Sequence, residues 1–357
     1  MTGEDKRPEE RVALADIDQQ ELQGVPLLAR MKIERLVVFR ALQVGDMLCA
    51  VPALRALRAT LPKARITLAG LPWAAQFASR YRNYIDDFAV FPGHPAFPEQ
   101  PAREAELEAF YEDMRSRQFD LALQLHGSGQ VSNRIVGEFG AKTVAGSVAP
   151  GSALADQVSF MEYPEEGAEP LRLLNLVEFL GATAVGAHLE FPLTDEDERE
   201  LQDSGLAAGL EPGSYICIHP GARIRDKCWP PARFAEVADA LADEFGVKVV
   251  LTGSAKEADL TAAVAEHMRN PARDTASPLS IGAMAALMSR ARLLVCNDTG
   301  VSHIAAGLRL PSVVVFSKAD MQRWAPLDQE RHRCIWDPEG QRVALALQHA
   351  RSLMKEG

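Results

Sequence analysis

Short apolar runs alternate with amphipathic segments along most of this 357-residue chain. The segments that follow the runs carry the 3.6-residue periodicity of helices, and this alternation predicts βαβ units with a parallel sheet. The predicted strands of the first half are Arg35–Phe39, Arg65–Gly70, Asp87–Phe91, Asp120–Leu125 and Lys142–Gly146. The predicted helices of this half run to about Thr60 and over Glu104–Arg117 and Leu171–Leu180.

The pattern changes at Phe191–Glu200, where a proline precedes an acidic run. Such a segment is typical of a linker that enters a helix, with Thr194 as N-cap and Asp197 three residues later. The alternation then repeats. The predicted strands are Tyr215–His219, Val247–Leu251, Leu293–Cys296 and Ser312–Phe316, with helices at about 232–245, 256–268, 281–291 and 301–308. The fold class is therefore α/β, with two doubly wound parallel-sheet domains and a cleft between them.

This pattern divides the chain into four parts. Residues 1–30 lack core periodicity and are expected to be a dispensable extension. Residues 31–190 and 191–338 form two Rossmann-like domains, and 339–357 form a final amphipathic helix. In open α/β sheets, ligands bind beyond the carboxyl ends of the strands, so motifs at those ends are the candidates for chemistry.

Charge and cysteine content exclude several classes of protein. The formal net charge of −11 argues against a nucleic-acid partner. The five cysteines are odd in number and lack a CxxC pair, which argues against a disulfide framework and a zinc site. Residues 1–30 contain no signal-peptide core, and no apolar run approaches the roughly 18 residues of a membrane span. We therefore expect a cytoplasmic protein.

The first candidate motif, Arg40–Asp46 (RALQVGD), follows the first predicted strand and precedes a helix. Gly45 would permit a tight turn, and Asp46 falls at the start of the helix. Its carboxylate can simply cap the helix, or it can face the cleft as a general base. The segment lacks GxGxxG, so a nicotinamide oxidoreductase loses its main support.

The second motif, Ile218–Pro230 (IHPGARIRDKCWP), places three cations after a strand. Arg223, Arg225 and Lys227 form either a solvated basic loop or a site for a diphosphate.

The fourth motif, Leu251–Asp259 (LTGSAKEAD), also consists of a strand end followed by a turn. Its Glu257 either accepts hydrogen bonds from a ribose or only complements a helix dipole.

The third motif, Cys296–Ala306 (CNDTGVSHIAA), joins a strand to a helix. Asp298, Thr299 and Gly300 lie where the helix begins, and the exposed N–H groups of such an end bind anions. Asp298 can alternatively cap the helix. His303, one turn further on, either lines the site or packs internally.

Together these segments resemble the heptosyltransferases of glycosyltransferase family 9, from about Arg35 to Phe316. The resemblance is carried by RALQVGD with VPALRALRATLPKARI, by HPGA with KCWPPARFAEVADAL, and by NDTGVSHIAAGLRLPSVVVF. It implies the GT-B fold, with the C-terminal helix returning to the first domain. Two departures lie near the substrates: Leu42-Gln43 stands where the family often has two serines, and Ala222-Arg223 where some members have Thr or Ser.

The resemblance also implies a role for each candidate residue. Asp46 is the expected catalytic base, with Arg40 and Gly45 on the acceptor side. The expected donor-binding residues are Arg223, Lys227, Glu257, Asp298, Thr299, Gly300 and His303. Lys227 contacts the donor diphosphate, and Glu257 lies near the ribose. The implied donor is a nucleotide sugar of the ADP-heptose type.

The implied acceptor is a lipopolysaccharide-core or related glycan, which can be lipid-linked, and peripheral contact with the inner membrane is left open. We expect an inverting displacement in which Asp46 deprotonates the acceptor hydroxyl. Lys227 and the backbone amides of Thr299 and Gly300 then stabilise the leaving diphosphate, so neither a metal nor a cofactor is expected. Two alternatives remain: a sugar-nucleotide epimerase with further acid–base residues, and a binding protein without turnover.

Overall fold

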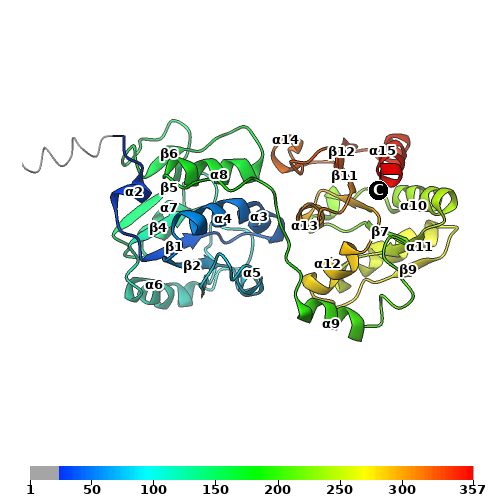
Figure 1. Cartoon of the computed structure of the whole chain (residues 1–357), viewed down its shortest axis with the longest axis horizontal. Helices are drawn as coiled ribbons and strands as arrows, with labels where there is room; N and C mark the ends of the chain where they lie inside the picture. The colour runs from blue at the N-terminus through cyan, green and yellow to red at the C-terminus, as the bar shows by residue number, and fades with distance from the viewer. Residues whose placement is uncertain (1–23, 357) are drawn as a thin grey trace, which may run out of the picture.

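The computed structural model describes residues 24–356, which form two parallel six-stranded sheets. Their strand orders are β3-β2-β1-β4-β5-β6 and β12-β11-β10-β7-β8-β9. Figure 1 shows the two sheets in separate lobes, each covered by its own helices. The predicted α/β class with two doubly wound sheets is therefore confirmed.

The first sheet follows the predicted strands closely. Its central strand β1 is a continuous apolar run, as expected of a parallel strand covered on both faces. Leu36 and Val38 face one core, and Val37 and Phe39 face the other. The strands are β1 Arg35–Phe39, β2 Arg65–Gly70, β3 Asp87–Val90, β4 Leu121–Gln124, β5 Thr143–Val148 and β6 Phe160–Glu162. The helices are α3 Val44–Cys49, α4 Val51–Thr60, α5 Ala74–Arg80, α6 Leu107–Ser116, α7 Ser132–Gly137 and α8 Glu169–Phe179.

The second sheet repeats this arrangement. Its strands are β7 Tyr215–His219, β8 Lys248–Leu251, β9 Ala272–Asp274, β10 Leu294–Asn297, β11 Ser312–Phe316 and β12 His332–Trp336. Its helices are α10 Pro231–Phe245, α11 Ala258–His267, α12 Ile281–Ser289, α13 Gly300–Leu308, α14 Met321–Trp324 and α15 Val343–Glu356. The strands β6, β9 and β12 and the helices α5, α7 and α14 were not predicted, because such short elements carry little periodicity.

The segment between the sheets is held from both sides. Helix α9 (Asp195–Asp203) begins after Thr194, and the predicted N-cap is confirmed as a capping box with Asp197. Asp197 also forms an ion pair of 2.6 Å with Arg80 of α5. Helix α9 itself packs against α12 of the second sheet. The linker thus joins α5 of one lobe to α12 of the other.

Both ends of the chain differ from their prediction. Helix α15 packs on α10 and buries Ala346, Ala350 and Met354 in the core of the second sheet rather than returning to the first domain (Figure 1). At the other end, residues 1–23 lie outside the described residues, but Leu27 and Leu28 of helix α2 (Leu27–Arg30) are only 7% exposed each. These apolar side chains pack on the first domain, so residues 24–30 belong to its body.

Among the helices of residues 24–356, none combines the length and the apolarity that crossing a bilayer requires.

Candidate active site

Two cavities lie where the first turn of α3 faces the first turn of α13. The small cavity, of about 230 Å³, contains Asp46 from the first lobe and Lys227 from the second. The large cavity, of about 660 Å³, contains Glu257. Residues Gln43, Gly45, Ala222, Arg223, Thr299 and Gly300 line both cavities. Each predicted site residue except Arg40 therefore lines one cavity or both.

Gly45 lies at a close contact between the two lobes, where helix α3 meets helix α13. A Cβ atom there would lie 2.8 Å from Cδ2 of His303 and 3.3 Å from the Cα of Gly300. Gly45 lies within helix α3 and has no positive φ, so it does not form the predicted tight turn. Its missing side chain instead allows α3 to contact α13.

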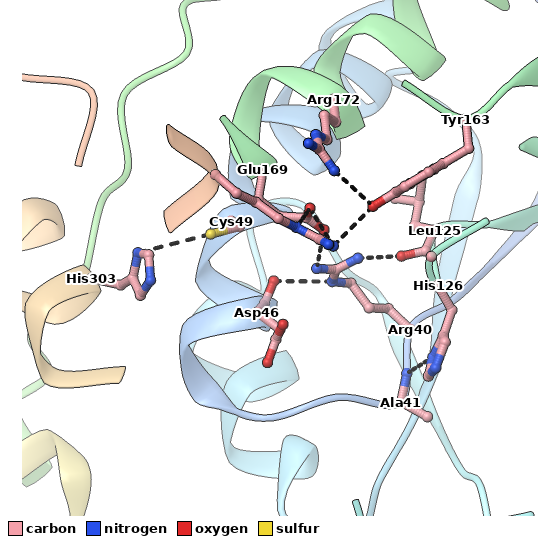
Figure 2. Close-up of polar contacts among 12 residues, drawn as sticks. Arg40, Ala41, Asp46, Cys49, Leu125, His126, Tyr163, Glu169, Arg172 and His303 are labelled. Atoms are coloured by element: carbon pink, nitrogen blue, oxygen red, sulfur yellow. Dashed lines mark hydrogen bonds and ion pairs between the residues drawn. The ribbon is translucent and has the colours of Figure 1, made fainter. Parts of the chain in front are cut away.

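Asp46 occupies the first turn of α3 without capping it. The N-cap is Gln43, which has an extended backbone and no capping side-chain bond. Arg40 donates to the Asp46 carbonyl oxygen at 3.0 Å, whereas Figure 2 shows the carboxylate pointing away from that guanidinium. The carboxylate lines the small cavity. This geometry favours the general-base interpretation over the capping one.

Arg40 is fully buried, which differs from its predicted place on the acceptor side. Its guanidinium donates to the carbonyl oxygens of Asp46 and Leu125 and, at 3.1 Å, to the carboxylate of Glu169 (Figure 2). With no exposed surface, Arg40 cannot contact an acceptor. It instead holds the backbone of the Asp46 turn in place.

Glu169 is a residue that the sequence did not single out. It is 1% exposed and lies between Arg40 and Arg323, whose Nε donates to it at 2.9 Å. Burial acts to raise the pKa of Glu169, but the two guanidinium groups outweigh this effect and hold the pKa below its usual range. Because Arg323 lies on α14, this buried carboxylate links the second lobe to the turn that carries Asp46.

Lys227 and Asp298 form an ion pair at the edge of the small cavity. Lys227 is the last residue of a 3₁₀ helix (Arg225–Lys227) that follows β7. Its Nζ lies 3.0 Å from Oδ2 of Asp298, which follows β10. Asn297 fixes this loop, because its side chain accepts from Trp229 N and donates to the Pro220 carbonyl, both at 2.8 Å. The sequence predicted Asn297 only as a backbone donor at the start of α13, and the positioning role of its side chain was not predicted. The loop therefore presents a cation beside α13.

The N-terminus of α13 is open toward both cavities. Thr299 is the N-cap, and its side chain makes no capping hydrogen bond. Asp298 precedes the cap, so it does not cap the helix as the alternative interpretation supposed. Uncapped first-turn amides carry partial positive charge, and the Lys227 ammonium group, paired with Asp298, lies beside them. An anionic group such as a diphosphate suits this position.

His303 both lines the small cavity and packs internally, so its two predicted alternatives are not exclusive. Its Nδ1 lies 3.8 Å from Sγ of Cys49, and its ring packs edge-on against Trp324 (Figure 2 shows the Cys49 contact). Burial lowers the pKa of His303 although Asp298 and Asp46 act to raise it. The imidazole is therefore neutral near pH 7.

Glu257 makes a contact at the start of a helix, as the alternative to ribose binding supposed. One carboxylate oxygen accepts from the backbone N of Ser254 at 2.9 Å and from its hydroxyl at 2.7 Å, in a capping box. Burial acts to raise its pKa, but His219 and the Ser254 hydrogen bonds outweigh this and lower it. Glu257 also lines the large cavity, so its ribose role stays a prediction.

The cations of the basic loop differ in their surroundings. Arg225 is paired with Asp259 at 2.9 Å. Arg223 is exposed and lines both cavities. Gln43, expected near the substrates, lines both cavities, and further lining residues that were not predicted include Glu99, His219, Thr275, Met284 and Trp324. Within residues 24–356, no group of three or more His, Cys, Asp and Glu side chains is arranged to hold a metal ion.

Comparison with known proteins identifies relatives of this chain. Lipopolysaccharide heptosyltransferase 3 of Escherichia coli is 32% identical over 131 residues, which cover 36% of this chain and only 37% of that protein. Lipopolysaccharide heptosyltransferase 2 of Salmonella typhimurium is 25% identical over 310 residues, or 83% of this chain and 86% of that protein.

Solved structures share the fold over nearly the whole chain. The glycosyl transferase family 9 protein from Veillonella parvula superposes with a TM-score of 0.76 at 21% identity, covering 91% of this chain and 98% of that one. The E. coli heptosyltransferase WaaC with ADP gives 0.66 at 19% identity, covering 90% and 99%. The model of glycosyltransferase family 9 (heptosyltransferase) matches residues 108–348, from α6 into α15. The chain therefore belongs to glycosyltransferase family 9, the heptosyltransferases.

Proposed function

We propose that this protein transfers a heptose-like sugar, with inversion, from a nucleotide-diphosphate donor to a hydroxyl of a glycan acceptor. The main support for this proposal is the small cavity, which residues of both lobes line. There the Asp46 carboxylate of the first lobe faces Lys227 and the first turn of α13 in the second lobe. A base opposite an anion site is the arrangement that glycosyl transfer from a diphosphate requires.

The donor in this proposal is of the ADP-heptose type and is held mainly by the second lobe. The diphosphate lies at the N-terminus of α13, beside Lys227 and within reach of the exposed Arg223. The large cavity receives the nucleoside, with Glu257 near the ribose. Support comes from family membership and from the solved E. coli relative, which was determined with ADP.

In the reaction we propose, the acceptor hydroxyl oxygen attacks the anomeric carbon while Asp46 removes its proton. The bond between the anomeric carbon and the diphosphate oxygen breaks in the same step, so the configuration inverts. Lys227 and the amides of the α13 first turn stabilise the negative charge that develops on the leaving nucleotide. These groups supply the electrostatic stabilisation without a metal ion or a cofactor in our proposal.

The acceptor in this proposal is a lipopolysaccharide-core or related glycan, free or lipid-linked. The names of the curated relatives, which are lipopolysaccharide heptosyltransferases, support this class. Cytoplasmic placement with peripheral contact at the inner membrane belongs to the same proposal. Family membership favours transfer over the epimerase alternative, and the cavity-facing Asp46 carboxylate argues against a protein without turnover.

Nucleotide release from a panel of sugar nucleotides, measured with and without glycan acceptors, tests the proposal. We expect ADP to appear from ADP-heptose only when an acceptor is present, and chelators to leave the rate unchanged. Conversion of the sugar nucleotide to its epimer without nucleotide release would support the epimerase instead. Loss of activity with chelator and its restoration by magnesium would contradict the metal-independent step.

A further inference from the structure

Glu99 is a carboxylate in the small cavity to which no function has been assigned. It lies in the loop between β3 and the 3₁₀ helix Glu104–Glu106, and it lines the cavity together with Asp46. Its Oε2 is buried, yet it has no hydrogen-bond partner among the described residues. A buried carboxylate oxygen is costly to leave unpaired, so this atom requires an explanation.

The loop that carries Glu99 is anchored rather than loose. The side chain of Gln43, the N-cap of α3, donates to the Glu99 carbonyl oxygen at 3.2 Å. Two residues earlier, the Phe97 ring stacks on His126 with a centroid separation of 4.3 Å. Gln43 is also one of the two residues at which this chain departs from the expected serines. Its contact therefore ties the position of Glu99 to the turn that carries Asp46.

The wall that the first lobe contributes to this cavity is acidic. It consists of Gln43, Gly45, Asp46 and Glu99, and it includes no basic residue. Arg40, the cation that contacts the Asp46 turn, is fully buried and bonded to protein groups. The cations of the cavity belong to the second lobe, where the donor diphosphate is proposed to bind. On the first-lobe side, an anionic group beside the attacking hydroxyl would thus meet the carboxylates of Asp46 and Glu99, because Arg223 and Lys227 lie on the second-lobe side.

We propose that Glu99 determines acceptor specificity by accepting a hydrogen bond from an acceptor hydroxyl that neighbours the attacking one. The sugar at the reaction centre is therefore an uncharged polyol with adjacent hydroxyls, and not a residue that carries a phosphate or carboxylate at that place. This inference rests on the proposed function, since Asp46 must mark the acceptor side. It adds to that function the chemical class of the acceptor residue.

The test uses ADP-heptose as donor and methyl heptosides as acceptors. The acceptor set contains the parent heptoside, derivatives that each lack one hydroxyl, and a derivative phosphorylated beside the attacking position. We expect Glu99→Ala to lower kcat/KM for the parent heptoside by about 10- to 100-fold, the range for losing a hydrogen bond to a charged group. For one deoxy derivative the same substitution should have almost no effect, because the hydrogen bond is already missing.

Glu99→Gln separates hydrogen bonding from charge. Its amide oxygen still accepts a hydrogen bond, so most activity on the parent heptoside should remain, while discrimination against the phosphorylated derivative should weaken. Glu104→Ala, an exposed change in the adjoining 3₁₀ helix, is the matched control and should behave as wild type. Donor affinity, measured by calorimetry, should be the same in all variants.

Two results would overturn the inference. One is a wild-type preference for the phosphorylated heptoside over the parent. The other is a Glu99→Ala loss that is equal for the parent and every deoxy derivative, which would indicate a purely structural loop residue. Absence of transfer from ADP-heptose to any acceptor, including glycan extracts, would instead refute the proposed function itself.

Discussion

Replacing Gly45 with alanine adds one methyl group at the contact between the two lobes. The new Cβ would lie 2.8 Å from Cδ2 of His303, whereas ordinary contacts of this kind begin near 3.4 Å. His303 is held by Cys49 and Trp324, and the second close atom, the Cα of Gly300, is backbone. Neither neighbour can move aside alone, so α3 must separate from α13 by roughly half an ångström.

The magnitude follows from the cost of overpacking, which is about 1–3 kcal/mol for an added methylene in a tight contact. This energy acts against the arrangement in which Asp46 faces Lys227. The population of that arrangement should fall by about 5- to 150-fold, and kcat with it. Donor affinity should change little, because Lys227 and the first turn of α13 both belong to the second lobe.

Steady-state rates at saturating donor and acceptor, beside calorimetric titration with donor, measure both quantities. Gly137→Ala is the matched control, because no atom lies within 4 Å of the added Cβ and its backbone needs no positive φ. That variant should keep wild-type rates. A Gly45→Ala protein with normal kcat would refute the argument, and so would a fall in kcat that a lowered melting temperature fully accounts for.

Three further predictions concern the proposed roles and the chain start. Asp46→Asn should reduce turnover by about 10²–10⁴-fold while calorimetry finds donor affinity retained; retained turnover would exclude Asp46 as the base. Lys227→Ala should weaken donor binding by about 10- to 100-fold in the same titration, since it removes a charge-assisted contact, and unchanged affinity would contradict this. A chain that begins at Met31 should lose about 2–5 kcal/mol of unfolding free energy relative to one that begins at Gly24, because two buried leucines are removed; equal denaturant midpoints would refute it.

The sequence predicted the central strands of both sheets to within one or two residues. Buried parallel strands such as Arg35–Phe39 and Ser312–Phe316 are continuous apolar runs, so local composition suffices to locate them. The packing of α15 could not be predicted in this way, because an amphipathic helix shows which face is buried but not against which partner. The same limit applies to Leu27 and Leu28, whose burial depends on a distant part of the chain, around Leu180.

In the candidate site, the sequence located residues that follow strand ends. Asp46, Lys227 and Asp298 lie at the carboxyl edge of their sheets, where the topology alone brings such residues to the cleft. Residues brought together from remote segments were missed. Glu169 and Arg323 are 154 positions apart, and neither has a local pattern that indicates an ion pair. Arg40 was placed on the acceptor side because of its nearness to Asp46, and only its tertiary contacts reveal that it is buried.

The buried carboxylate of Glu169 also bears on how substrates reach the cleft. It keeps both guanidinium partners only while α14 of the second lobe lies against the first, because Arg323 is the partner that crosses between them. Opening the cleft removes Arg323 and admits water to a carboxylate that is then bound to Arg40 alone, and breaking a buried pair in this way is unfavourable. The empty protein should therefore rest with a narrow cleft. Substrate access then requires a transient opening, which added salt favours because it stabilises the separated charges once water surrounds them.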